Sequence, residues 1–74
     1  MEPYIGDILL FGGNFVPYGW LPCDGAEHPM SHYQTLYTLI GTTYGGDGQT
    51  TFRLPDMTAM TPDQMLYGIC IYGS

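Results

Sequence analysis

The chain has 74 residues, with seven acidic side chains, a single arginine and a formal net charge of −6 at pH 7. It therefore lacks the basic patch that nucleic acid or an anionic membrane surface would need, and neither is expected as a partner. No stretch of about eighteen apolar residues occurs, so membrane insertion is not expected either. The N-terminus lacks the basic and apolar regions of a secretory signal.

Hydrophobic residues make up 45% of the chain and aromatic residues 15%, which is typical of a folded domain rather than a disordered tail. The length allows one domain, over residues 1–74. Burial of apolar surface would stabilise so small a fold by roughly 110 kcal/mol, and ordering its residues would cost about as much. We therefore expect added stability from association with other copies, from a disulfide, or from both.

The first expected strand is Tyr4 to Phe11, which ends in a continuously apolar run. Such a run is typical of a strand that is buried on both faces or packed against a neighbouring copy. A turn follows at Gly12 to Asn14, and Trp20 to Cys23 is expected to form a short strand or bend. Trp20 offers the largest burial of any single side chain, so we expect it to anchor the core.

One helix is expected, from about Ser31 to Ile40. Ser31 and Gln34 fit a capping box at its start, and Gly41 lies where a left-handed C-terminal cap is expected. A helix this short is not stable alone, so it must pack on Trp20 and on the longer strands. Its apolar face is formed by residues at helical spacing, of which Leu36 and Ile40 are expected core anchors: Tyr33, Leu36, Tyr37 and Ile40.

A glycine-rich segment follows, Gly41 to Asp56, with the sequence GTTYGGDGQTTFRLPD. No helical or alternating period runs through it, so a loop is predicted. Gly45 to Gly48 suits a tight reversal, because glycine reaches positive φ at little cost. Thr50 to Leu54 is β-branched and aromatic enough for a short extended segment, which Pro55 ends.

Residues 57–65 are expected to form a connector in which Thr61-Pro62 fits the start of one helical turn. Leu66 to Tyr72 is the last expected strand, with Ile69 and Ile71 on one face. Together these elements predict an α+β fold: a small β-rich domain with one short helix and a long glycine-rich loop.

The glycine-rich segment resembles, almost residue for residue, the signature of the phage tail collar domain, a family that also includes the microcystin-dependent proteins. The resemblance covers about residues 4–56 and extends to the closing strand of full-length members. Those members usually carry a long variable middle, of which only residues 57–65 remain here, so the resemblance identifies the chain as a shortened but complete member. The other similar segments are Ile5 to Pro17, Gly19 to Gly25, Leu36 to Gly41 and Leu66 to Ile71.

Cys23 and Cys70 permit one disulfide, which would stabilise the fold by roughly 3 to 4 kcal/mol. The alternatives are that both are buried as small hydrophobic side chains, or that they pair between copies.

His28 and His32 do not share a helical face, and both are expected to be exposed loop residues. Asp47 is expected to be a turn residue. None has the spacing of a zinc or calcium site, so no metal and no cofactor is expected.

Arg53 is the only basic side chain. We expect it to pair with Asp56, with Asp24 or with a carboxylate of a neighbouring copy. The alternative is contact with a glycan or an anionic ligand, with Tyr44 close by. No serine, cysteine or carboxylate pair has a catalytic context, so no enzymatic activity is expected.

The first function that these features indicate is a structural module that self-assembles into a homo-oligomer, as a fibre or tube subunit. The family resemblance implies homo-oligomeric, often trimeric, fibres, and a helical filament is the other form of assembly. The edges of Tyr4 to Phe11 or Leu66 to Tyr72 are expected to pair between copies. The interface candidates are Tyr4, Ile8, Leu10, Tyr67, Ile69, Ile71 and Tyr72.

The alternative function is a receptor-binding module that recognises a cell-surface glycan, as a tail-fibre tip does. An exposed cluster of Tyr18, Tyr44 and Phe52 would be its signature, because aromatic rings stack on sugars and tyrosine adds a polar tip. Both functions predict a location outside the cell, in an extracellular filament or on a virion.

Overall fold

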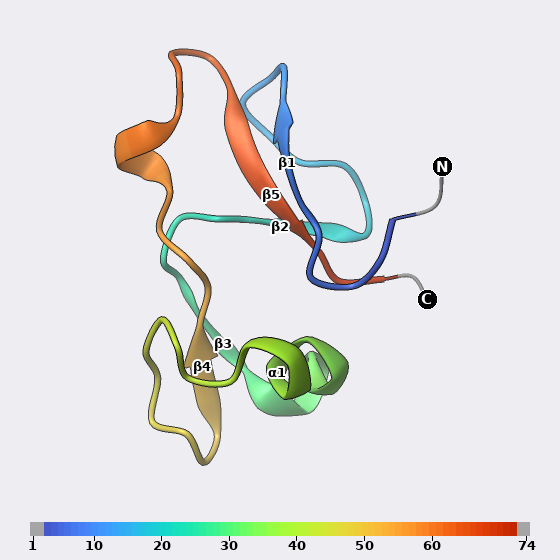
Figure 1. Cartoon of the computed structure of the whole chain (residues 1–74), viewed down its shortest axis with the longest axis vertical. Coiled ribbons are helices and arrows are strands. Elements are labelled where there is room, and N and C mark those ends of the chain that lie inside the picture. Colours follow the sequence, from blue (N-terminus) through green and yellow to red (C-terminus); the bar gives the residue numbers. More distant parts are fainter. Residues whose placement is uncertain (1–2, 73–74) are drawn as a thin grey trace.

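The structure is a computed structural model that describes residues 3–72. It confirms the expected α+β fold, in which β-structure dominates (Figure 1). It contains two antiparallel sheets. The three-stranded sheet has the order β1-β5-β2, with β1 at Ile8–Phe11, β5 at Leu66–Cys70 and β2 at Trp20–Pro22. The two-stranded sheet pairs β3, Glu27–Pro29, with β4, Thr51–Arg53.

The strand β5 is last in the chain but central in its sheet. It pairs with β1 on one side, where Leu9 lies opposite Gly68, and with β2 on the other, where Leu21 lies opposite Ile69. The expectation that Leu66 to Tyr72 offers a free edge is therefore wrong. The edges of this sheet are β1 and β2.

The expected first strand is shorter in the structure, because a turn occupies its beginning. Gly6 has a φ of 94°, and the Asp7 N–H donates to the Tyr4 carbonyl (3.0 Å). Glycine accepts this left-handed conformation without the clash that a Cβ atom would cause. The strand β1 therefore begins only at Ile8.

The helix α1 spans Gln34–Ile40, and the expected capping box is absent. Ser31 lies inside a 3₁₀ turn, Met30–His32, and the helix begins after Tyr33, which makes no side-chain cap hydrogen bond. The 3₁₀ turn forms because β3 continues to Pro29 and the Met30 N–H donates to Thr50 (2.9 Å). At the other end Gly41 ends the helix at the expected position and with a positive φ of 57°, but its ψ of −142° lies outside the expected left-handed helical region.

A second 3₁₀ turn, Thr58–Met60, lies in the connector before β5. The helical turn expected at Thr61-Pro62 does not form: residues 62–65 make a tight turn instead, in which the Met65 N–H donates to the Pro62 carbonyl (3.2 Å) and Gln64 has a φ of 63°. The helical turn of the connector lies three residues earlier. There the Asp56 carboxylate accepts hydrogen bonds from the Thr58 N–H (3.1 Å) and hydroxyl (2.6 Å), which start the turn.

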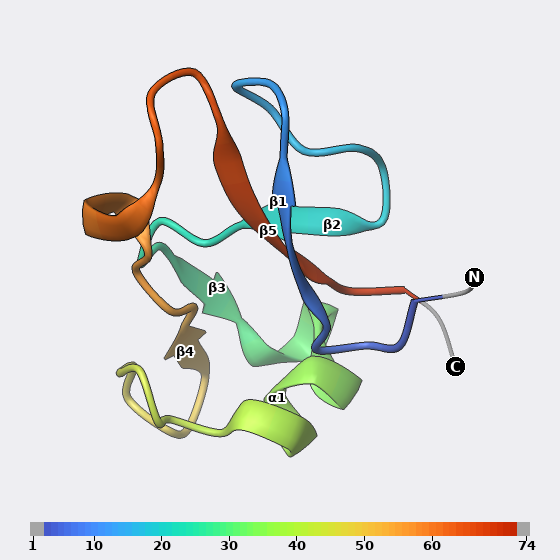
Figure 2. The ribbon, with the colours of Figure 1, turned by 45° about the horizontal axis from the view of Figure 1, so that its top comes forward.

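The core lies between the three-stranded sheet, the helix and the two-stranded sheet (Figure 2). Leu36 is fully buried, and Ile40 packs against the core from the same helix. Contrary to expectation, Trp20 is not part of this core. It lies opposite Cys70 in the sheet, and its side chain is only half-buried where it packs against Phe11. The buried hydrophobic residues are Cys23, Leu36, Phe52, Leu54, Ile69 and Cys70.

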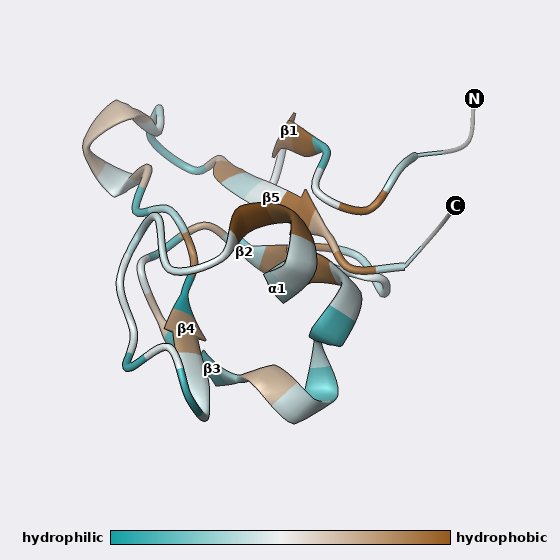
Figure 3. Cartoon of the chain, turned by 60° about the horizontal axis from the view of Figure 1, so that its bottom comes forward, coloured by the Kyte–Doolittle hydropathy of each residue, from teal (hydrophilic) through white to brown (hydrophobic). Residues whose placement is uncertain are grey.

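The molecule is flat, with principal extents of 34 × 28 × 15 Å. So thin a body has few layers, and Ile8, Leu9 and Leu10 of β1, a strand coloured as hydrophobic in Figure 3, remain exposed. No helix among residues 3–72 has the length and apolar character needed to cross a membrane.

Candidate functional site

The glycine-rich loop is organised around the carboxylate of Asp47. This carboxylate accepts hydrogen bonds from the backbone N–H groups of Gln49 (2.8 Å), Thr50 (2.8 Å) and Thr51 (2.9 Å), and from the Thr50 hydroxyl (2.8 Å). These donors stabilise the ionised form and hold the pKa of Asp47 well below its ordinary value. Asp47 is therefore a turn residue, as expected.

The same loop lies against β4 through its glycines. The Arg53 N–H donates to the Gly45 carbonyl (3.0 Å). At Gly46, which has a φ of 104°, a Cβ atom would lie 2.7 Å from the Thr51 carbonyl oxygen and closer still to the backbone of Phe52. Only glycine allows this approach of two backbone segments, so the loop shape depends on it.

Arg53 does not form the expected ion pair within residues 3–72. Its guanidinium donates to the carbonyl of Gly25 (3.1 Å), and its aliphatic stem packs on Gly45. The nearby carboxylates have other donors: Asp56 accepts from Thr58, which lowers the pKa of Asp56, and Asp24 accepts from the Ala26 N–H (3.0 Å). The Arg53 guanidinium and these two carboxylates are therefore engaged in hydrogen bonds with groups close to them in the fold.

The two cysteines cannot form a disulfide with each other. Both are buried free thiols. Cys70 lies opposite Trp20, whereas the Cys23 N–H donates to the Tyr67 carbonyl (2.9 Å), so the thiols are three positions apart along the strand pair. Three positions correspond to about 10 Å, and a disulfide requires Cα atoms within about 7 Å. Burial, helped by the charge of Asp24, also raises the pKa of Cys23 to about 11.

No group of three metal-ligating side chains occurs in the described part of the chain. His32 is exposed, as expected, but His28 lies in β3 and is half-buried. Its ring contacts Tyr33 edge to face, with centroids 5.5 Å apart. Burial of the ring lowers the pKa of His28, which keeps it neutral.

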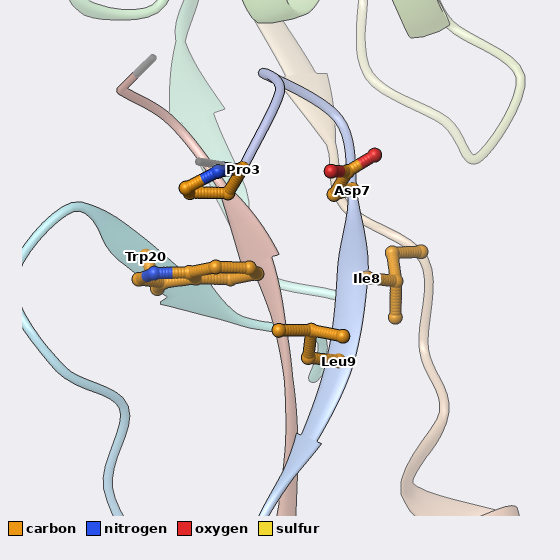
Figure 4. Close-up of a pocket in the computed structure, with 5 residues that line it drawn as sticks. All are labelled: Pro3, Asp7, Ile8, Leu9 and Trp20. Atoms are coloured by element: carbon orange, nitrogen blue, oxygen red, sulfur yellow. The ribbon is translucent and has the colours of Figure 1, made fainter. Parts of the chain in front are cut away.

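One apolar surface is the side of the three-stranded sheet that faces away from the core, which we call the outer face. It carries Leu9, Phe11 and Trp20, because these residues alternate with those that face the core. Phe11 and Trp20 pack edge to face at 5.0 Å. Figure 4 shows Leu9 and Trp20 on one side of the sheet and Ile8 on the other. Next to them lies an open groove of about 500 Å³, lined by Pro3, Asp7, Ile8, Leu9 and Trp20.

An aromatic pair extends this face at its end. The Tyr18 and Tyr72 rings lie 5.4 Å apart, and the Tyr18 hydroxyl donates to that of Tyr72 (3.4 Å). Tyr18 is 89% exposed. The expected cluster of Tyr18 with Tyr44 and Phe52 is wrong, because Phe52 is fully buried in the core against Tyr37.

The expected interface residues divide into two groups. Tyr4, Ile8, Leu10 and Tyr72 are exposed. Ile69 is buried, and Tyr67 and Ile71 are partly buried against the core, so these three do not lie on a free surface.

Sequence reasoning did not single out Leu9 as a surface residue, expected Tyr18 to be exposed but beside Tyr44 and Phe52 rather than Tyr72, and placed Trp20 in the core. The signal for the outer face was Gly68, since a glycine inside a strand often marks the close approach of another group. Here that group is the Phe11 ring.

The sequence matches the family model described as Phage Tail Collar Domain over residues 6–62. The chain belongs to the phage tail collar domain family. The match includes β1, β2, the helix and the whole glycine-rich loop, and it continues past the Asp56 at which the resemblance was expected to end. No curated protein matches the sequence. Collar domains are structural modules of phage tails rather than an enzyme family, and membership implies a virion-associated location.

Proposed function

We propose that this collar domain is a non-enzymatic structural module that self-assembles into a homo-oligomer and serves as a fibre or tube subunit outside the cell. The observation that carries the proposal is the uncovered outer face of a thin molecule. Leu9 is 46% exposed although it lies in the middle of a strand, and Trp20 beside it is only half-buried. Apolar surface of this kind is stabilised when a second protein surface covers it.

The polar groups of the domain support the same proposal. Asp47, Asp56 and the Arg53 guanidinium are engaged in hydrogen bonds within the glycine-rich loop and its surroundings. The Cys23 thiol is buried and protonated, so it is a poor nucleophile. The chemistry of the described residues is therefore structural, and association is the activity left to the exposed surface.

Sedimentation velocity over a wide range of protein concentrations tests the proposal, with electron microscopy of the same samples. We expect species larger than the monomer, whose population rises with concentration. A protein that sediments as a monomer up to its solubility limit would contradict self-assembly.

A second function, recognition of a cell-surface glycan, is favoured by one observation, the exposed Tyr18–Tyr72 pair. Two tilted rings with hydroxyl groups at their tips offer both stacking and hydrogen bonding to a sugar. On a glycan array, Tyr18→Ala would abolish binding if this pair is the site. Tyr44→Ala is the matched control, because Tyr44 is also exposed but lies on the glycine-rich loop.

A further inference from the structure

The backbone hydrogen bonds at the start of β1 determine which way its polar groups point. The Gly6 N–H donates to the Cys70 carbonyl (2.9 Å), and the Cys70 N–H donates to the Asp7 carbonyl (2.8 Å). Antiparallel partners alternate between pairs that exchange hydrogen bonds and pairs that do not. Leu9 and Phe11, two and four residues after Asp7, therefore bond to β5 through their backbone groups. The backbone N–H and C=O groups of Ile8 and Leu10 point away from β5, toward the open side of the sheet.

No strand among residues 3–72 pairs with this outward side of β1. Natural monomers protect such edges with charged residues or proline, and Ile8 to Phe11 contains neither. The side chains of Ile8, Leu9 and Leu10 are each more than a third exposed. The strand β1 thus combines unpaired backbone groups with exposed apolar side chains.

The other edge of the sheet, β2, is protected. The Cys23 N–H bonds to the Tyr67 carbonyl on β5, so by the same alternation the outward residues of β2 are Trp20 and Pro22. The Trp20 N–H already donates to the Pro17 carbonyl (3.2 Å), and Pro22 has no N–H. An added strand would find no free donor there, so β1 is the edge of this sheet that can accept one.

We infer that two copies of the chain pair through their β1 strands, antiparallel and about a two-fold axis at Leu9. Ile8 of each copy then lies opposite Leu10 of the other, so that the outward N–H and C=O groups of both residues are satisfied. The two sheets become one continuous sheet. This inference rests on the proposed self-assembly and names one of its contacts; a two-fold contact closes at a dimer, so a fibre or tube needs a second interface as well.

A second copy fits this edge because the pairing is self-complementary. On the outer face Leu9 meets Leu9 of the other copy, and on the inner face Ile8 meets Leu10, so every central pair is apolar. Asp7 lies opposite Phe11 of the other copy rather than opposite a second Asp7, which avoids repulsion between like charges. The groove between Pro3 and Trp20 lies beside this contact and can receive apolar side chains of the other copy (Figure 4).

The size of the contact is feasible for so small a domain. A standard interface buries about 800 Å² on each partner, about one sixth of the 4787 Å² accessible surface of the chain. Strand pairing alone buries less surface area than this, so the outer face next to Leu9 has to contribute to the contact. The exposed Leu9 side chain and the partly buried Trp20 are positioned to do so.

The test is a cysteine at the two-fold axis, Leu9→Cys. The proposed pair places the two residue-9 Cα atoms about 4.5 Å apart, as in a pair that exchanges no hydrogen bonds, and this separation fits a disulfide. Under mild oxidation we expect a covalent dimer on a non-reducing gel. Leu39→Cys is the control: Leu39 is 60% exposed on α1, near Gly6 but outside the pairing strand β1, and should remain monomeric on the gel.

A charge at the same position gives an independent readout. Leu9→Lys would place two ammonium groups opposite each other across the axis. We expect the dissociation constant measured by sedimentation equilibrium to rise at least about tenfold, which corresponds to roughly 1.4 kcal/mol. Leu39→Lys makes the same change of charge on the helix and should leave association unchanged.

The outcomes separate this inference from the proposed function. If the unmodified protein associates but Leu9→Cys gives no more covalent dimer than Leu39→Cys, and Leu9→Lys associates normally, the β1 edge is excluded while self-assembly stands. If the unmodified protein is a monomer at all concentrations, both proposals are overturned.

Discussion

The Phe11 ring lies directly over Gly68 of the neighbouring strand. A Cβ atom at residue 68 would lie 2.8 Å from the Phe11 ring and 2.9 Å from a methyl group of Val16. Gly68→Val is therefore expected to displace both side chains and to lower the free energy of unfolding by about 1 to 3 kcal/mol. Urea unfolding measures the change. Gly12→Ala is the control, because a Cβ at Gly12 meets nothing within 4 Å, and an equal loss there would contradict the packing argument.

The glycine-rich loop depends on Gly46 in a different way. Its positive φ and its contact with the β4 backbone both oppose a side chain. We expect Gly46→Ala to destabilise the fold by about 1 to 3 kcal/mol, measured as a lower midpoint of thermal unfolding. Gly13→Ala, at an open position without positive φ, should have little effect. A Gly46→Ala protein as stable as Gly13→Ala would show that the loop does not need this contact.

The stability of the fold should depend on pH through Asp47. Its pKa is lower in the folded state, so ionised Asp47 contributes stability above the ordinary aspartate pKa of about 3.9, and this contribution is lost as the pH falls through the folded pKa. Asp47→Asn should be less stable than the unmodified protein at pH 7, and the difference should shrink below about pH 4.

Urea unfolding at pH 7 and pH 3 makes the comparison. The control is Asp63→Asn, because no hydrogen bond to the Asp63 carboxylate occurs within residues 3–72. A difference for Asp47→Asn that stays constant over this range would argue against the role of the charge.

The two cysteines should behave as buried thiols. Because no bond joins Cys23 and Cys70, a reductant should leave the thermal unfolding midpoint unchanged. With the pKa of Cys23 raised to about 11, a thiol reagent at pH 8 should label Cys23 only after denaturation. Mass spectrometry of the native and unfolded protein reads this out. A fold that melts earlier in reductant would contradict the register of β2 and β5.

Local patterns in the sequence predicted the helix and the strands, but not which of these elements lie side by side in the fold. The spacing of apolar residues predicted the helix, and Gly41 predicted where it ends. The helix begins later than predicted, at Gln34, because β3 extends to Pro29. The run Ile8 to Phe11 was correctly recognised as a strand. Nothing in that run says whether it is central or at an edge, because this depends on where β5 lies.

The candidate site was harder to predict for the same reason. The pairing of Tyr18 with Tyr72 joins residues 54 positions apart, and the separation of Cys23 from Cys70 depends on strand register. Trp20 is the largest apolar side chain, yet β2 points it away from the core. Size and hydropathy indicate that a residue will be covered, but they do not say whether its own chain or another one covers it.

The central position of β5 has a consequence for how the chain folds. Because β1 and β2 each pair with β5 and not with each other, neither can join a sheet until Leu66–Cys70 has left the ribosome. The helix and the β3–β4 pair use nearer contacts and can form earlier. The nascent chain therefore carries two unpaired apolar strands through most of its synthesis, and folding should be slow compared with helical domains of this size.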